Sequence, residues 1–375
     1  MGSAGGAALP LHRGLAERLI CLHDEMKGDG LLAGLNRIAV ALYDDSTDLL
    51  KTFIHSSDAD SPLDHSAARL SDLPTLQQLA WTGARRTIND LASVAGQGQD
   101  YALRLLKGGY QSSYTVPMRH KDAFYGFLFF NSCQRDFFSA PVIHRLRPYA
   151  ELISLAVMRE IDTVRMMQAA VKVIRQVSSA RDEETGSHLA RMTRYARLIA
   201  LGMAETHGLS DEMVEFIFQF CPLHDVGKVA VPDSILLKPG RLTPDEYEVM
   251  KSHVGKGIEI VDLMCRDFGL RAMPHFDLLR NIVAYHHEAI DGSGYPHGLK
   301  GDEIPIEARI AAVADVFDAL TSVRPYKEAW SNQRAFELLQ SEAGIKFDPD
   351  CVAALVARQE QIVAIQTQFE ETPYD

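Results

Sequence analysis

The chain has 375 residues, of which 46% are hydrophobic and 23% charged, and its formal net charge is -12. This acidic balance argues against non-specific binding to DNA or RNA, which needs a basic face. No apolar run approaches the roughly 18 residues of a membrane span, so no membrane association is expected. The length favours two domains.

The cysteines are odd in number, scattered and without a CxxC pair. This usage argues against a disulfide framework and against a thiolate zinc site, and it predicts a reducing, cytoplasmic location.

The first part of the chain predicts an α+β domain over residues 11–150, after a flexible lead over residues 1–10. A helix is expected from Leu11 to Met26. Strand-like runs follow, RIAVALY and LLKTFIHS, and later QSSYTVPM and FYGFLFFNS predict paired strands across the turn RHKDA. These last strands and the helix expected after them resemble a GAF domain, a regulatory module, without a ligand signature.

Residues 151–180 predict one long linking helix, because no glycine or proline follows Pro148 in this stretch. Apolar residues recur along it at heptad-like spacing, at Val157, Val164, Met167, Val171 and Ile174. The stripe predicts a helix that pairs two chains into a homodimer. The alternative is that the same stripe packs on its own domain.

The remainder, residues 181–375, reads as all helical. One helix start is well marked, because Thr243, Pro244 and Glu246 form a capping box with proline at the first helical position. His253 lies inside that helix.

Histidines and acids gather in this second half. The tripeptide Leu-His-Asp occurs at His23 and again at His224. Around His23 the sequence offers no clustered partners, so a solvated or capping pair is expected there. Around His224 the candidate metal ligands are abundant: Glu184, His188, His224, Asp225, His253, His286, His287 and Asp315.

Imidazole and carboxylate ligands without thiolates suit iron, manganese or zinc, and this set exceeds what one ion needs. We therefore expect two or three metal ions. Asp315 lies in the apolar run ARIAAVADVFDAL, where an unpaired carboxylate would be costly to bury. The alternative is that Asp315 pairs with Arg309 or another cation.

The order of these residues, with HDVGK at 224–228, GYP at 294–296 and RPYK at 324–327, resembles the HD-GYP family of phosphodiesterases over roughly residues 165–350. The resemblance implies an all-helical variant of the HD metallohydrolase fold. It also implies a bi- or trinuclear metal centre, with iron first and manganese or another divalent metal as alternatives. The implied reaction is hydrolysis of cyclic di-GMP to pGpG, and whether pGpG is processed further to GMP is left open.

The resemblance assigns ligands to three metal positions. Those of the first are His188, His224, Asp225 and Asp315. Asp225 bridges to the second, whose other ligands are His253 and His286. The third lies between His287 and Glu184, whose presence favours three ions over two.

Other residues are assigned to catalysis and substrate binding. Asp225 and Lys228 are the candidate catalytic residues, and Lys228 is expected on the same helix face as His224, where it can contact phosphate or assist the leaving oxygen. Arg324 and Lys327 are expected to bind substrate phosphates, since a guanidinium grips phosphate bidentately. The alternatives are that Lys228 is an ordinary surface lysine and that Arg324 and Lys327 lie in an exposed basic turn.

Tyr295 has three open roles: it orders the pocket edge, touches guanine, or meets a GGDEF-type diguanylate cyclase at the GYP loop. Gly292 and Gly294 are expected to permit tight backbone geometry around it. Asp318 follows Asp315 by nearly one helical turn and is expected to orient a metal ligand.

Three functions remain open. The first is a cyclic di-GMP phosphodiesterase regulated by the N-terminal domain. The second is a cyclic di-GMP receptor with little turnover, and the third is a hydrolase of another cyclic dinucleotide. The motifs GxSxG, GxxxxGK[ST] and GxGxxG are absent, which argues against serine hydrolase, P-loop and Rossmann enzymes.

Overall fold

The computed structural model describes residues 14–59, 61–95, 100–177, 186–267, 275–322 and 329–370. The chain divides into two compact units, Met1–Asp162 and Thr163–Asp375. Each unit is described by itself below.

The N-terminal unit is built on one antiparallel sheet of six strands, in the order β3-β2-β1-β6-β5-β4. The strands are β1 (Arg37–Asp44), β2 (Leu49–Ser57), β3 (Ala67–Arg69), β4 (Arg86–Ile88), β5 (Ser112–His120) and β6 (Ala123–Ser132). The four long strands confirm the sequence prediction. The two edge strands have only three residues each, which is too short to show an alternating pattern.

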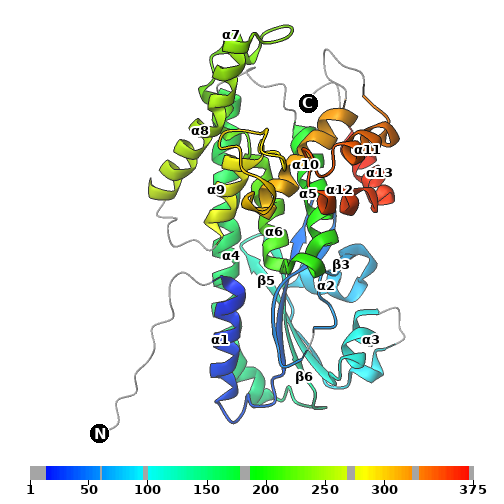
Figure 1. The fold of residues 1–375 in the computed structure, drawn as a ribbon. Helices are drawn as coiled ribbons and strands as arrows, with labels where there is room; N and C mark the ends of the chain where they lie inside the picture. The colour runs from blue at the N-terminus through cyan, green and yellow to red at the C-terminus, as the bar shows by residue number, and fades with distance from the viewer. Residues whose placement is uncertain are drawn as a thin grey trace. The chain divides into compact units, whose positions relative to one another are not determined.

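Helices cover both faces of this sheet (Figure 1). Helix α1 (Leu15–Lys27) packs on β2, and the first half of α4 (Ala140–Val177) lies on the same side. On the opposite face lie α2 (Pro74–Thr82) and α3 (Asp100–Lys107), with short 3-10 turns at Leu70–Asp72 and Leu91–Ser93. The expected α+β architecture is confirmed.

The apolar stripe on α4 is buried within the chain. Of its members, Val157 and Val164 are fully buried and Met167 and Val171 nearly so, while the side chain of Ile174 lies outside the described residues. These four side chains therefore do not form an exposed dimer seam, and the alternative of packing within the chain is the correct one. The homodimer itself stays a prediction.

The C-terminal unit is a bundle of helices, and its described residues form no strand. Its helices are α5 (Gly186–His207), α6 (Asp211–Phe220), α7 (Asp233–Leu236), α8 (Pro244–Asp267), α9 (Phe276–Tyr285), α10 (Ile306–Thr321), α11 (Asn332–Ser341), α12 (Pro349–Val356) and α13 (Gln359–Gln368). Helix α5 is central, because it packs against α6, α10 and α12. The predicted all-helical fold is confirmed.

The capping box predicted at the start of α8 is present. The Thr243 hydroxyl accepts a hydrogen bond from the Glu246 backbone amide at 3.3 Å, and the Glu246 carboxylate accepts one from the Thr243 amide at 2.7 Å. Two backbone donors that the helix itself leaves without acceptors are thereby satisfied.

Among the described residues, no helix combines the length and the apolar character needed to cross a bilayer.

Candidate metal centre

Five separate elements of the C-terminal unit bring histidines and aspartates together. His188 comes from α5, His253 from α8 and Asp315 from α10, while His286 and His287 directly follow α9. His224 and Asp225 sit between two 3-10 turns, Cys221–Leu223 and Val226–Ala230. The long helices thus supply a rigid frame, and the ligands with consecutive numbers lie where the backbone turns.

The side chains form two adjacent groups, each with its ligand atoms within 4.8 Å of one another. The members of one are His188, His224 and Asp315, and those of the other are Asp225, His253, His286 and His287. Asp225 joins the two groups, since its Oδ2 lies 3.1 Å from His224 Nε2 and its Oδ1 lies 3.0 Å from His253 Nε2.

The protein fixes which nitrogen of three histidines points into the site. Nδ1 of His224 lies 2.8 Å from the Cys221 carbonyl oxygen, Nδ1 of His253 lies 2.8 Å from that of Met250, and Nδ1 of His286 lies 2.9 Å from that of Ile282. A carbonyl oxygen only accepts, so each Nδ1 carries the proton and each Nε2 keeps a lone pair. Every one of these lone pairs lies near Asp225.

That arrangement fits bound cations. Among the described residues, Asp225 Oδ1 and the Nε2 atoms of His253 and His286 are buried without hydrogen-bond partners, although the nitrogens lie 3.0 and 3.5 Å from the oxygen. Lone pairs that face a carboxylate oxygen in a buried site are unfavourable unless a cation lies among them. The donor set of imidazoles and carboxylates is the one preferred by iron, manganese and zinc.

His188 is oriented differently, by the carboxylate of Asp318. Its Nδ1 lies 2.8 Å from Asp318 Oδ2, and Arg191 donates from Nε at 2.7 Å and from Nη2 at 3.0 Å to the same carboxylate. The Ser322 hydroxyl donates to Asp318 at 2.9 Å. Burial by itself would raise the pKa of Asp318, but His188 and Arg191 outweigh it and lower this pKa. Asp318 therefore stays ionised and holds the His188 ring, as expected from the sequence.

Lys228 contacts Asp225, with Nζ 2.8 Å from Oδ2. The prediction that it shares a helix face with His224 is wrong, because Val226–Ala230 is a 3-10 turn in which residues three apart are aligned. Burial would raise the pKa of Asp225, but Lys228 and His224 outweigh it and keep this pKa well below its usual range. Asp225 is thus an anion at neutral pH.

Comparison with known proteins supports this geometry. Residues 179–351 match the family described as HD domain. Over these residues the chain is similar to that family.

Relatives of known activity cover about half of the chain. A cyclic di-GMP phosphodiesterase response regulator, RpfG, from Xanthomonas campestris is 48% identical over 190 residues, which is 50% of this chain and 47% of that protein. A 3'3'-cGAMP-specific phosphodiesterase 2 from Vibrio cholerae is 42% identical over 192 residues, 51% of this chain and 35% of that protein. The chain thus spans half or less of the length of these relatives. The resemblance drawn from the motifs is confirmed.

Among solved structures, a GAF domain/HD domain protein from Geobacter sulfurreducens is similar, with a TM-score of 0.30 and 17% identity. The match covers 38% of this chain and 90% of that one.

Two glycines that were not predicted from the sequence bring the segment with His224 and Asp225 close to α8. A Cβ on Gly227 would lie 1.9 Å from the His253 carbonyl oxygen and 2.4 Å from the Gly257 amide nitrogen. Only glycine allows the two backbones to approach so closely, and this approach sets Asp225 beside His253. Gly257 follows His253 by four residues on α8, and that spacing was the available signal.

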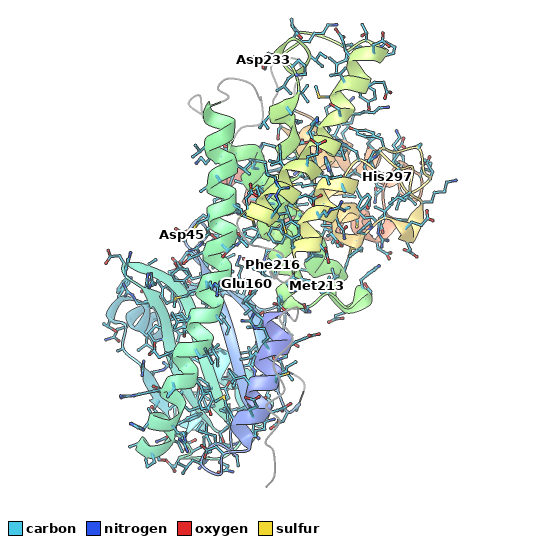
Figure 2. The ribbon with its side chains drawn as sticks, turned by 90° about the vertical axis from the view of Figure 1, so that its left-hand side faces the viewer. Asp45, Glu160, Met213, Phe216, Asp233 and His297 are labelled. Atoms are coloured by element: carbon cyan, nitrogen blue, oxygen red, sulfur yellow. The ribbon has the colours of Figure 1, made fainter. Side chains whose placement is uncertain are left out.

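The segment after α9 folds back over His287 (its His297 is labelled in Figure 2). The Tyr295 ring stacks on His287 with centroids 4.6 Å apart, and the buried Glu288 accepts hydrogen bonds from the backbone amides of His297 and Leu299. Burial, with His286 alongside, holds the pKa of His287 well below its usual value, so this ring is neutral and able to bind a metal.

Both glycines of this segment are required by its geometry, as predicted. Gly292 has a positive φ of 84°, and a Cβ on Gly294 would lie 2.3 Å from the Ala289 amide nitrogen.

Three predicted site residues lie outside the described residues: Glu184, Arg324 and Lys327.

The alternative partner for Asp315 is not used, because Arg309 pairs with Asp348 at 2.6 Å and with Asp302 at 3.2 Å. The expectation of a solvated His23 is wrong. That ring is fully buried, and its two nitrogens lie 2.8 Å from the Ser56 hydroxyl and 3.1 Å from the Leu35 carbonyl oxygen.

Proposed function

We propose that this chain is a metal-dependent phosphodiesterase that hydrolyses cyclic di-GMP to pGpG or GMP. The observation that carries the proposal is the convergence of three Nε2 lone pairs on Asp225 in a buried site beside Lys228. The names of the relatives support a cyclic dinucleotide as the substrate.

The ligand groups support a division between metal positions. His188, His224, Asp225 and Asp315 would hold one ion. Asp225, His253 and His286 would hold a second, and His287 with Glu184 a third. Iron is the proposed metal, with manganese or another divalent ion as the alternative. Ions held here would supply charge neutralisation on phosphoryl oxygens and would lower the pKa of water.

The chain's own residues have separate tasks. Asp225 ties the two groups together, and Asp318 fixes the His188 ring. The Lys228 ammonium, only about one-fifth exposed, lies next to Asp225 and can neutralise a phosphate oxygen or protonate the leaving alkoxide. Arg324 and Lys327 are proposed to bind the substrate phosphates, and Tyr295 to order the edge of the site through its contact with His287.

The wider setting is also a proposal. The N-terminal unit would regulate the HD domain, and the chain would act as a homodimer. A GGDEF-type diguanylate cyclase would bind at the GYP loop. The five cysteines are all free thiols, which supports a reducing cytoplasmic compartment.

The test is turnover of cyclic di-GMP by protein purified without oxygen, with metal content measured on the same sample. Release of pGpG or GMP by protein that carries two or three ions, and its loss in Asp225→Ala, is the expected result. Metal-loaded protein that binds cyclic di-GMP without product would instead be a receptor.

The second candidate substrate is 3'3'-cGAMP, favoured by the 42% identity to the Vibrio cholerae enzyme with that specificity. Parallel assays with both dinucleotides at equal concentration separate the two. A kcat/KM for 3'3'-cGAMP that exceeds the value for cyclic di-GMP would overturn the proposed preference.

A further inference from the structure

A polar row crosses the sheet of the N-terminal unit. Arg37 on β1 lies opposite Ser57 on β2 and opposite Asn131 on β6, and Asn131 lies opposite Ser113 on β5. Residues directly opposite one another in antiparallel strands point to the same face. The four side chains thus form one continuous row over four strands.

This row lies on a face that is otherwise covered by apolar side chains. On the same face, Ala41 and Phe127 belong to a buried cluster with the α2 residues Leu76 and Leu79. A second cluster contains Ile88, Leu91, Ala102, Leu105 and Tyr110. The covered face of such a sheet is normally apolar, so a polar row with Arg37, Ser113 and Asn131 all buried requires a physical reason.

Arg37 is the unusual member. Its side chain is 2% exposed, and it donates from Nη1 to Asn131 Oδ1 at 3.0 Å and from Nη2 to Ser61 Oγ at 3.2 Å. Its Nε is buried and has no hydrogen-bond partner among the described residues. Both partners are neutral. Within the described part of the chain no carboxylate lies at ion-pair distance from this guanidinium. Asp64, which influences Arg37 from further away, is paired with His55 at 3.0 Å.

A second guanidinium reaches the same face. Arg86 on β4 lies opposite the buried Thr115, which lies opposite Phe129 and therefore on the face of Asn131. The half-buried Arg86 donates through Nη2 to the Tyr101 hydroxyl, and its Nε is likewise buried without a partner in the described part of the unit.

A purely structural role does not account for these features. A cross-strand tie between neutral groups needs no buried cation, and a buried cation is normally stabilised by an adjacent anion. A guanidinium fork matches the two oxygens of a carboxylate or phosphate, and charge-assisted bonds of this kind are about twice as strong as neutral ones. We propose that the N-terminal unit binds a small organic anion, through a carboxylate or phosphate group, at Arg37 and the polar row around it.

Isothermal titration calorimetry on the full chain tests this with three matched probes: benzoate, phenyl phosphate and the neutral benzamide. The expected result is saturable binding of at least one anionic probe with a Kd of about 1 mM or tighter, and none of benzamide. Binding of benzoate alone assigns a carboxylate ligand, and binding of phenyl phosphate alone assigns a phosphate ligand. Phenyl phosphate is titrated into chelator-treated protein, so that the metal centre does not contribute.

Variants decide whether Arg37 carries the binding. Arg37→Met should weaken anion binding at least about tenfold. The control Arg135→Met should leave anion binding unchanged, because the Arg135 side chain is 59% exposed and lies 3.6 Å from Asp90. If Arg37→Met does not fold, as judged by circular dichroism, Arg37→Lys replaces it and should retain weakened binding, because the charge remains without the fork. Unchanged binding in the Arg37 variant, equal binding of benzamide, or no anion binding up to about 10 mM would overturn the proposal.

Discussion

Replacing Asp318 with asparagine should damage both the stability of the C-terminal unit and its proposed metal binding. Asp318 is fully buried and accepts hydrogen bonds from His188, Arg191 and Ser322. Asparagine keeps one acceptor oxygen, puts an amide donor against existing donors, and leaves the charge of Arg191 without its counterion. Breaking a buried pair in this way costs about 3–5 kcal/mol of unfolding free energy. Solvent screens little here, since Arg191 is only 5% exposed.

The assay uses a Trp81→Phe background. The chain has two tryptophans, so Trp330 of the C-terminal unit is then the only one, and its fluorescence follows urea unfolding of that unit. With a urea dependence of about 1–3 kcal/mol per M, a loss of this size lowers the midpoint by about 1–5 M. Mn²⁺ titration followed by electron paramagnetic resonance gives the metal affinity, which should fall about 10- to 100-fold because the His188 ring loses its orientation.

Asp302→Asn is the matched control. That side chain is 98% exposed and accepts from Arg309 at 3.2 Å, so its loss should change the unfolding free energy by less than about 0.5 kcal/mol. Equal midpoints for the two variants would refute the reasoning about the buried pair. Lower stability with unchanged Mn²⁺ affinity would reject the orienting role of Asp318 alone.

Three further outcomes are expected. Gly227→Ala should reduce the bound metal per chain, because a Cβ 1.9 Å from the His253 carbonyl oxygen forces α8 to move by on the order of 1 Å; full metal content by elemental analysis would contradict this. Lys228→Met should lower kcat about 10²- to 10⁴-fold with metal content retained. The control Lys256→Met should match the parent enzyme in the same pGpG assay, because the Lys256 ammonium is about half exposed and contacts only Glu259 in the described structure. Chelation should lower the unfolding free energy measured by urea at the single tryptophan, by about 2.7 kcal/mol if the free metal had been at 100 times its Kd; an unchanged unfolding free energy would show that the ions do not stabilise the fold.

Local patterns in the sequence were enough to predict much of the fold. The four long strands alternate or are β-branched and aromatic over eight or more residues, and the capping box at Thr243 needs only residues three apart. Strands β3 and β4 were missed because three residues carry no periodicity. The stripe on α4 was misassigned because a heptad spacing shows which side chains share a face and does not show what covers that face.

The sequence by itself predicted the candidate metal-binding side chains, because imidazoles and carboxylates in this order are typical of a clustered metal site. It did not determine how they meet. The contact of Gly227 with α8, the 3-10 turn that aligns Lys228 with Asp225, and the carbonyl oxygens that fix the histidine tautomers all join residues through backbone geometry. The same holds for Arg37, whose lack of an anionic partner among the described residues shows only when the strands are in register. Burial, register and close backbone approach depend on atoms far apart in the chain, and only the tertiary structure decided them.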